Sequence, residues 1–295
     1  MKPLLTVLIP TLNNFDCMVR TVVSLIRNTE FPVQINVLDN ASTDESKNFI
    51  SGILASTKYE NCKAISMGSN KGWMGALNAG LKHVDTEFVC CLNDDVVFIP
   101  GHRKFWRELL NPFKFAEVGA TGPSSNFVMG GQNIFQVDLP LIYPTTLLIG
   151  FCMVLRTSLI KEIGGWDEKL PGGDDLDVSI RVRDSGNELF VVRSAYLHHV
   201  GQQTGPKVRP GWDNLEHQEQ TNNALIRKHG VRKWYECFQA KIDSNSNYMK
   251  ISAGFSDESI WLKDVVPTEG HGFNLGCGDM DVGTFGLDTA KPGEH

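Results

Sequence analysis

The segment Phe88–Leu92 constrains the fold of this chain more than any other. Its five residues, Phe-Val-Cys-Cys-Leu, are all apolar, so the alternation that marks a half-exposed strand is absent. A strand that is apolar on both faces is typical of a parallel sheet that helices cover on each side. We therefore expect this segment to lie inside such a sheet.

Three earlier segments extend the pattern toward the N-terminus. Residues 4–9, 34–38 and 64–67 read as short strands, with helical segments between them and Pro10 expected to end the first strand. This order predicts an α/β fold with a Rossmann-like, mainly parallel central sheet flanked by helices. Past residue 100 we expect helices at 106–110, 158–163, 176–183 and 216–229, strands at 146–155 and 189–197, a strand end and turn at 119–123, and loop at 124–144.

Composition narrows the class of protein. The 295 residues suffice for one large α/β domain with an appendage. A net charge of -6 argues against a nucleic-acid partner, and no apolar stretch reaches the ~18 residues of a transmembrane segment. The N-terminus enters a strand directly, unlike a signal peptide. Seven cysteines without a Cys-x-x-Cys pair favour the reducing cytoplasm over a disulfide or zinc framework. The oligomeric state is not indicated.

Polar loops follow the four N-terminal strands. The carboxyl ends of parallel strands meet at one edge of a sheet, where open α/β sheets bind ligands. Carboxylates there suit Mg²⁺ or Mn²⁺, which commonly bridge protein and substrate phosphates. Gly72, at the start of a helix, allows phosphate to approach the backbone. Each loop alone could equally be a solvated turn. The loops span residues 10–14, 39–44, 69–73 and 93–95.

Two common nucleotide-binding motifs are absent. A dinucleotide-binding fold would place Gly-x-Gly-x-x-Gly after the first strand, but Pro-Thr-Leu-Asn-Asn stands at residues 10–14. No Gly-x-x-x-x-Gly-Lys-Ser/Thr loop occurs either. A nucleotidyltransferase remains an alternative, although its first loop should be basic and glycine-rich.

Six segments, taken together, resemble the inverting family-two glycosyltransferases of GT-A fold. The likeness runs from about residue 4 to residue 204. It implies a metal-dependent, hexosyltransferase-like enzyme that moves a sugar from a nucleotide-diphosphate sugar to a hydroxyl of a glycan, lipid-linked or other acceptor, with Mn²⁺ or Mg²⁺. The segments are VLIPTLNN at 7–14, VLDNASTDES at 37–46, SNKGWMGALNAGL at 69–81, LNDDVV at 92–97, IGGWDEKLPGGDDLDVSIRVRDSG at 163–186 and AYLHHVGQQT at 195–204.

The resemblance also implies roles for individual residues on the donor side. Asp39 would contact the base, and residues 92–97 take the place of the Asp-x-Asp metal motif. Because Asn93 stands where an Asp is frequent, Asp95 is the expected metal ligand and Asp94 a sugar or ribose contact. His199, rather than His198, would be a further metal or diphosphate contact. The expected nucleotide-sugar contacts are Pro10, Thr11, Asn13, Asp39, Asn40, Asn70, Lys71, Gly72, Asn78, Asn93 and Asp94.

On the acceptor side, Asp174 and Asp175 replace the family's usual Glu-Asp pair. Asp175 is the expected general base and Asp174 its acceptor-binding neighbour, and their like charges should raise the pKa of one of them. Which of the two is the base stays open at this point. Both aspartates could equally mark the N-terminus of a helix, where a negative charge interacts favourably with the helix dipole. Trp166 is the expected stacking partner of an acceptor sugar, or else a core residue.

The resemblance divides the chain into three parts. Residues 1–240 would form the GT-A glycosyltransferase domain and residues 241–270 an irregular linker. Residues 271–295, with Gly-Cys-Gly-Asp at 276–279, resemble the start of an S-adenosylmethionine-dependent methyltransferase domain. A third function class, a non-catalytic nucleotide-sugar-binding module, would be expected to lack the acidic pair.

Overall fold

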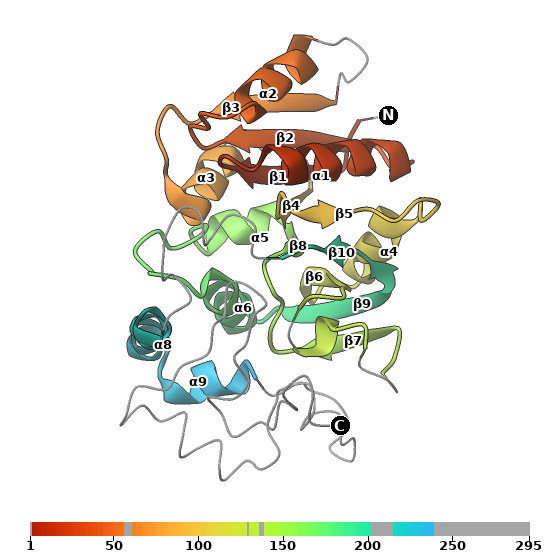
Figure 1. Ribbon diagram of the computed structural model, residues 1–295. Coiled ribbons are helices and arrows are strands. Elements are labelled where there is room, and N and C mark those ends of the chain that lie inside the picture. The colour runs from red at the N-terminus through yellow and green to blue at the C-terminus, as the bar shows by residue number, and fades with distance from the viewer. Residues whose placement is uncertain (1, 56–60, 129, 136–138, 202–214, 239–295) are drawn as a thin grey trace, which may run out of the picture.

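The computed structural model describes residues 2–55, 61–128, 130–135, 139–201 and 215–238. These residues form an eight-stranded sheet in the order β3-β2-β1-β4-β8-β6-β9-β7, with a two-stranded ribbon of β10 and β5 beside it (Figure 1). The α/β architecture with a mainly parallel central sheet is confirmed. The linker and the methyltransferase-like segment lie outside the described residues, so the proposed domain boundaries stay predictions.

The N-terminal half of the sheet is entirely parallel. β1 pairs with both β2 and β4, and β2 pairs with β3, always in the parallel sense. All four strands therefore end at the same edge, as expected from the sequence. The elements of this half are β1 (Leu5–Thr11), α1 (Phe15–Asn28), β2 (Val33–Asp39), α2 (Ser46–Ala55), β3 (Cys62–Ser66), α3 (Gly72–Leu81) and β4 (Phe88–Leu92).

The C-terminal half of the sheet is mixed. β8 runs antiparallel to β4 and β6, β9 is parallel to β6, and β7 closes the sheet antiparallel to β9. The elements of this half are β5 (Val96–Val97), α4 (Phe105–Leu110), η2 (Asn111–Lys114), β6 (Val118–Ser124), η3 (Gly130–Gln132), β7 (Ile142–Thr145), β8 (Cys152–Arg156), α5 (Thr157–Glu162), α6 (Asp174–Asp184), β9 (Glu188–Tyr196), β10 (His198–His199), α8 (Leu215–His229) and α9 (Val231–Glu236).

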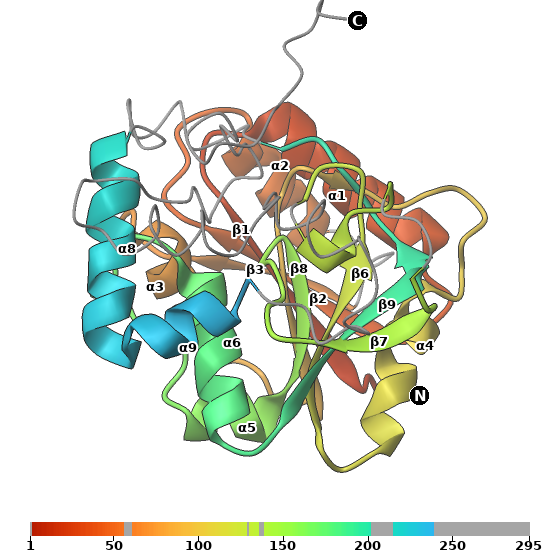
Figure 2. The ribbon, with the colours of Figure 1, turned by 90° about the horizontal axis from the view of Figure 1, so that it is seen from below.

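Helices cover both faces of the sheet, as the view from below shows (Figure 2). Successive strand residues point to opposite faces of the sheet and so belong to two separate apolar cores. Val7 and Ile9 lie in the core with residues of α1 and α4, whereas Leu8 lies in the core with residues of α3, α5 and α6. A third cluster joins the outer side of α6 to α8 and α9 through Leu225 and Trp234. The helix α6 is thus held between the sheet and an outer helical layer.

The expected loop at 124–144 contains the start of β7, and the strand expected at 146–155 begins only at Cys152. Two further local predictions were wrong for identifiable reasons. Pro10 does not end β1, which continues to Thr11. The pairing of β1 with β4 stops at Leu8, so Pro10 lies where one side of the strand is unpaired and its missing N–H costs no ladder hydrogen bond. Residues 119–123 are not a turn but the middle of β6, whose seven residues are all buried. A Cβ on Gly119 would lie 2.7 Å from Leu159, so that glycine serves close packing.

Candidate functional site

The predicted site residues gather at the edge where β1 to β4 end. The dipeptide Gly150-Phe151, which leads into β8, lies at the same edge because β8 runs antiparallel to β4 and Cys152 pairs with Leu92. The Phe151 carbonyl accepts a 2.8 Å hydrogen bond from the Asn93 N–H. A Cβ on Gly150 would lie 3.6 Å from the Cβ of Asp175. This dipeptide therefore lies next to the acidic pair through Gly150 and next to Asn93 through Phe151.

Asp95 and His199 face each other beside the two-stranded ribbon of β5 and β10. Asp95 Oδ1 lies 3.2 Å from His199 Nε2, and both side chains are about 95% buried. His199 Nδ1 lies 2.8 Å from the Phe127 carbonyl oxygen, which can only accept, so Nδ1 carries the hydrogen and Nε2 presents a lone pair. Among the described residues, Asp95 Oδ1 has no hydrogen-bond partner. The Asn93 Nδ2 amide also lies 3.2 Å from His199 Nε2, to which it donates in this tautomer. The lone pair of Nε2 and Asp95 Oδ1 nevertheless face each other across 3.2 Å, an arrangement of two buried electron-pair donors that a cation would stabilise.

Asp94 points the other way. Its carboxylate accepts hydrogen bonds from Thr11 Oγ1 at 2.7 Å and from Asn14 Nδ2 at 3.0 Å. Burial raises the pKa of Asp94 to about 7, and the hydrogen bonds from Thr11 and Asn14 oppose that rise. Asp94 thus ties the end of β1 and the start of α1 to the end of β4. Its contact with sugar or ribose stays a prediction.

The first two donor-side loops bind mainly to one another. Asn13, at a positive φ of 49°, accepts hydrogen bonds from the Thr43 and Asp44 backbones through Oδ1. Asp39, which is 6% exposed, accepts a 2.8 Å hydrogen bond from the Ser42 N–H. These side chains hold the loop backbones in place at the edge of the sheet.

The third donor-side loop is held in the same way. Asn40 accepts from the Lys71 N–H and donates to Asn70 Oδ1, which in turn accepts from the Gly72 N–H. Gly72 has a φ of 70°, a conformation that favours glycine. This geometry turns the chain into α3 at the loop that carries the exposed Lys71 side chain.

The acidic pair starts α6. The Trp73 indole N–H donates a 2.9 Å hydrogen bond to Asp174 Oδ2, so the start of α3 meets the start of α6. Burial raises the pKa of Asp174 to about 6, and the Trp73 hydrogen bond opposes that rise. Burial, followed by the neighbouring Asp174 charge, raises the pKa of Asp175 well above its ordinary value. Two carboxyl groups with raised pKa values are suited to proton transfer near neutral pH.

Trp166 and Asn78 lie apart from this group. Trp166 is 3% exposed and packs in the core that includes Leu81, which leaves little of its ring for a sugar. Asn78 donates to the Trp166 carbonyl at 2.7 Å and accepts from the Trp166 N–H at 2.9 Å. The structure therefore places Asn78 as a brace for the backbone of Trp166. The sugar-binding roles of both residues stay predictions.

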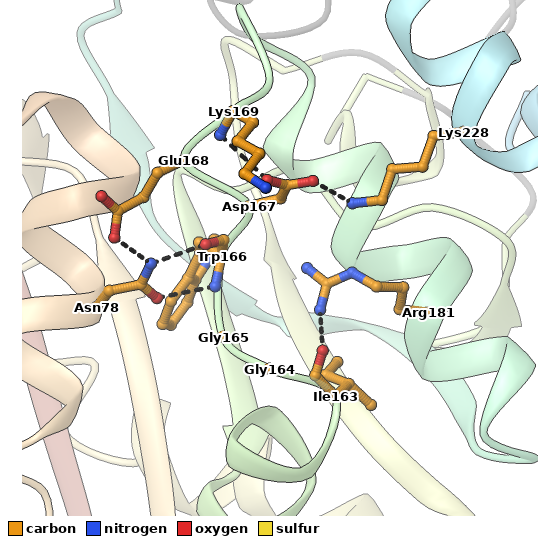
Figure 3. Close-up of a pocket in the computed structure, with 10 residues that line it drawn as sticks. All are labelled: Asn78, Ile163, Gly164, Gly165, Trp166, Asp167, Glu168, Lys169, Arg181 and Lys228. Carbon is orange, nitrogen blue, oxygen red and sulfur yellow. Dashed lines mark hydrogen bonds and ion pairs between the residues drawn. The ribbon is translucent and has the colours of Figure 1, made fainter.

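A pocket of about 510 Å³ opens beside these two residues and contains neither Asp95 nor the acidic pair (Figure 3). Arg181 and Lys228 reach its wall, but Arg181 bonds to Asp177 and Lys228 pairs with Asp167 and Asp177. These cations are therefore already neutralised by carboxylates. The pocket is lined by Asn78, Ile163, Gly164, Gly165, Trp166, Asp167, Glu168, Lys169, Arg181 and Lys228.

Sequence reasoning missed three contributors to the site. The role of Trp73 as a hydrogen-bond donor to Asp174 depends on the docking of α3 beside α6. Asn126 and Phe151, which surround His199, carry no signal in their own segments. Phe151 reaches this edge because it precedes β8, which runs antiparallel to β4, and Asn126 reaches it because it follows β6, which runs antiparallel to β8.

Two features of the described residues bear on membranes and metal ions. None of the described helices combines the length and the apolar character that crossing a bilayer requires. No group of three or more His, Cys, Asp or Glu side chains in this part of the chain could hold a metal ion. The expectations of a cytoplasmic location and of no nucleic-acid partner stay predictions.

The fold and the edge site define a GT-A type of protein. The chain superposes on a mannosyltransferase from Pyrobaculum calidifontis in complex with GDP-Man and Mn²⁺, with a TM-score of 0.61 and 14% identity over 91% of this chain and 77% of that one. The model of glycosyl transferase family 2 matches residues 6–164, more than half of the sequence. The chain belongs to glycosyl transferase family 2.

Two relatives from Mycobacterium tuberculosis resemble the chain in sequence. A pre-mycofactocin glycosyltransferase is 27% identical over 212 residues, which are 66% of this chain and 42% of that protein. An N-acetylglucosaminyl-diphospho-decaprenol L-rhamnosyltransferase is 26% identical over 231 residues, covering 63% of this chain and 73% of the relative. The chain thus spans less than half the length of the first of these relatives.

Proposed function

We propose that the protein is an inverting, metal-dependent glycosyltransferase that uses a nucleotide-diphosphate sugar as donor and a hydroxyl group as acceptor. The observation that carries this proposal is the placement of two chemically different groups around Gly150-Phe151. Asp95 and His199 face each other at 3.2 Å near Phe151, and Asp174 and Asp175 lie against Gly150. One pair suits a metal and diphosphate, and the other suits proton removal.

Asp95 and His199 would hold a divalent ion. The unpartnered Asp95 Oδ1 and the lone pair on His199 Nε2 are the donor types that Mn²⁺ and Mg²⁺ accept. Two protein ligands leave coordination positions for substrate phosphate oxygens, which is the usual arrangement for Mg²⁺ at nucleotide sites. When bound, such an ion supplies Lewis-acid stabilisation of the negative charge on the departing diphosphate.

Asp175 would act as the general base. It takes the proton of the acceptor hydroxyl while that oxygen forms a bond to the anomeric carbon of the donor sugar. The bond from this carbon to the diphosphate breaks, and its electron pair leaves with the diphosphate. Attack from the opposite face inverts the configuration. The raised pKa of Asp175 makes its carboxylate a stronger base than an exposed aspartate, and Asp174 is held beside it by Trp73.

The relatives support the substrate classes without naming the substrates of this chain. One relative is named for a decaprenol-linked acceptor, and one structural neighbour was solved with GDP-Man and Mn²⁺. We infer a diphosphate-activated donor, with a lipid-linked or other glycan acceptor. The nucleotide and the sugar are left to experiment.

A thermal-shift screen with UDP-, GDP- and TDP-sugars tests the donor class, because a ligand that binds only the native state raises the apparent stability. We expect at least one of them to raise the Tm with Mn²⁺ present and to raise it much less without the ion. A CMP-sugar, which lacks the diphosphate, is the matched control. Asp95→Ala should abolish the Mn²⁺-dependent part of the shift. Equal shifts in Asp95→Ala and the parent protein would refute the metal assignment.

A further inference from the structure

His199 is held on its backbone and on its ring by a segment that follows β6. Asn126 Oδ1 accepts a 2.8 Å hydrogen bond from the His199 N–H, and Asn126 Nδ2 donates a 3.0 Å hydrogen bond to the His199 carbonyl. One amide side chain therefore pairs with both polar backbone groups of a single residue. This fixes the histidine backbone much as a neighbouring strand would.

The ring of His199 is fixed by the same segment. The Phe127 carbonyl oxygen lies 2.8 Å from Nδ1, which sets the tautomer with the hydrogen on Nδ1. The Phe151 ring stacks on the imidazole with centroids 5.1 Å apart and planes 18° apart, and the Phe127 ring meets it edge-on at 5.9 Å. Rotation of the imidazole would break these contacts, so Nε2 stays directed at Asp95.

Asn126 is itself anchored. Its Oδ1 also accepts longer hydrogen bonds from Tyr196 Oη at 3.4 Å and Ser125 Oγ at 3.3 Å. Tyr196 ends β9, and Ser125 directly follows β6. The orientation of His199 is therefore tied to the two strands that lead into this end of the sheet.

We propose that Asn126 is a positioning residue for a divalent ion, acting through the backbone of His199, while the Phe127 carbonyl selects the histidine tautomer that can bind the ion. The proposal rests on the proposed function, since it takes Asp95 and His199 as the metal ligands. Partners that orient a metal-binding histidine commonly change metal affinity 10- to 100-fold when they are lost. Asn126 makes no contact with the ion in this scheme.

The test measures Mn²⁺ alone against the full chain, by counting free Mn²⁺ with electron paramagnetic resonance. We expect Asn126→Ala to raise the Kd for Mn²⁺ about tenfold. Asn133→Ala is the matched control, because the Asn133 side chain also braces loop backbone, at Val128 and Phe135, rather than the backbone of His199. Its Kd should stay within about twofold of the parent value. Asn126→Ser, which cannot span both backbone groups, serves if the alanine variant does not fold.

A second readout needs no metal. Long-range ¹H–¹⁵N spectra of histidine-labelled protein at pH 8 should show the Nδ1–H tautomer for His199 in the parent and a mixture of tautomers in Asn126→Ala. The His199→Ala variant separates two kinds of failure. If that variant binds Mn²⁺ as tightly as the parent, the proposed metal site is wrong. If His199→Ala weakens binding while Asn126→Ala leaves both the Kd and the tautomer unchanged, the role of Asn126 is refuted.

Discussion

The two halves of the central sheet build their parts of the site in different ways. In the parallel half, β3-β2-β1-β4, each strand delivers one short polar loop to the same edge, and these loops bond mainly to each other. In the mixed half, β8-β6-β9-β7, the contributing residues come from a loop before β8, the start of α6 and segments after β6 and β9. Topology alone places the first set, whereas the second depends on how distant segments pack.

This difference assigns the two halves different tasks in the proposed reaction. The donor side needs backbone groups and a carboxylate at regular positions, which a repeated strand–loop–helix unit supplies. The acceptor side needs a base whose pKa is tuned by its surroundings, and such surroundings require residues from several segments. Variants of the acidic pair at the start of α6 should therefore affect chemistry while leaving donor binding intact, whereas variants of His199 and Asn126 should weaken metal binding.

The largest expected effect tests this division at the proposed base. Asp175→Asn should lower kcat by roughly 10²- to 10⁴-fold, the usual contribution of a general base, because the amide cannot take the acceptor proton. The Kd for the donor should change less than about twofold, measured by calorimetry with Mn²⁺. Asp174→Asn is the matched variant and should retain more activity. The reverse order of activities would show that Asp174 is the base.

The second prediction concerns the packing of α6 on α8. Asp177 has no exposed side-chain area and pairs with Arg181, Lys228 and His229, so Asp177→Asn leaves the largely buried Arg181 guanidinium without its carboxylate partner. We expect a loss of about 3–5 kcal/mol in the free energy of unfolding at pH 7, measured by urea denaturation. Asp184→Asn on the same helix breaks only the half-exposed pair with Lys233 and should cost under about 1 kcal/mol. Equal losses in the two variants would contradict this view of the α6–α8 contact.

The ionisation of Asp177 also makes the free energy of unfolding depend on pH, and this dependence should differ between the parent protein and Asp177→Asn. Burial opposes ionisation of Asp177, but the hydrogen bonds from His229, Arg181 and Lys228 outweigh it and hold the pKa well below its ordinary value. A lowered folded-state pKa means that the stabilisation is present above the unfolded pKa of about 4 and is lost as the pH falls below it. The free energy of unfolding should therefore fall more steeply below pH 4 in the parent protein than in Asp177→Asn.

The smallest expected effect concerns the contact that joins the two halves. Trp73→Phe removes the hydrogen bond that favours the charged form of Asp174, so the pKa of Asp174 should rise further. Because Asp174 and Asp175 titrate as a pair, the acidic limb of the kcat/KM profile should then move to higher pH, with activity at pH 8 within about threefold of the parent value. Trp106→Phe also removes an indole hydrogen bond, to Thr29 on α1's side of the sheet, and should leave the profile unchanged. A Trp73→Phe profile that matches the parent would show that this contact is only structural.

The accuracy of sequence-based prediction follows the same division. Three features of the parallel half could be predicted: the apolar run of β4, the helices α1 and α3, and the meeting of four polar loops at one edge. Hydrophobic periodicity and the order of strands and helices are sufficient for consecutive parallel strand–helix units. The central strand β6 was missed because Gly119 and Pro123 resemble a turn. Their buried place depends on neighbours such as Leu159, which no local pattern reveals.

The sequence by itself determined the fold class, the family and the residue types at the site, since these depend on hydrophobic period and on motifs in a fixed order. Only the tertiary structure decided that Asp94 bonds to Thr11, that Trp166 is buried, and that Trp73 contacts Asp174 and Asn126 contacts His199. Adjacent residues of one loop have nearly the same local signal. Their directions are set by contacts with segments more than 70 residues away in the sequence, and those contacts form only when the sheet assembles.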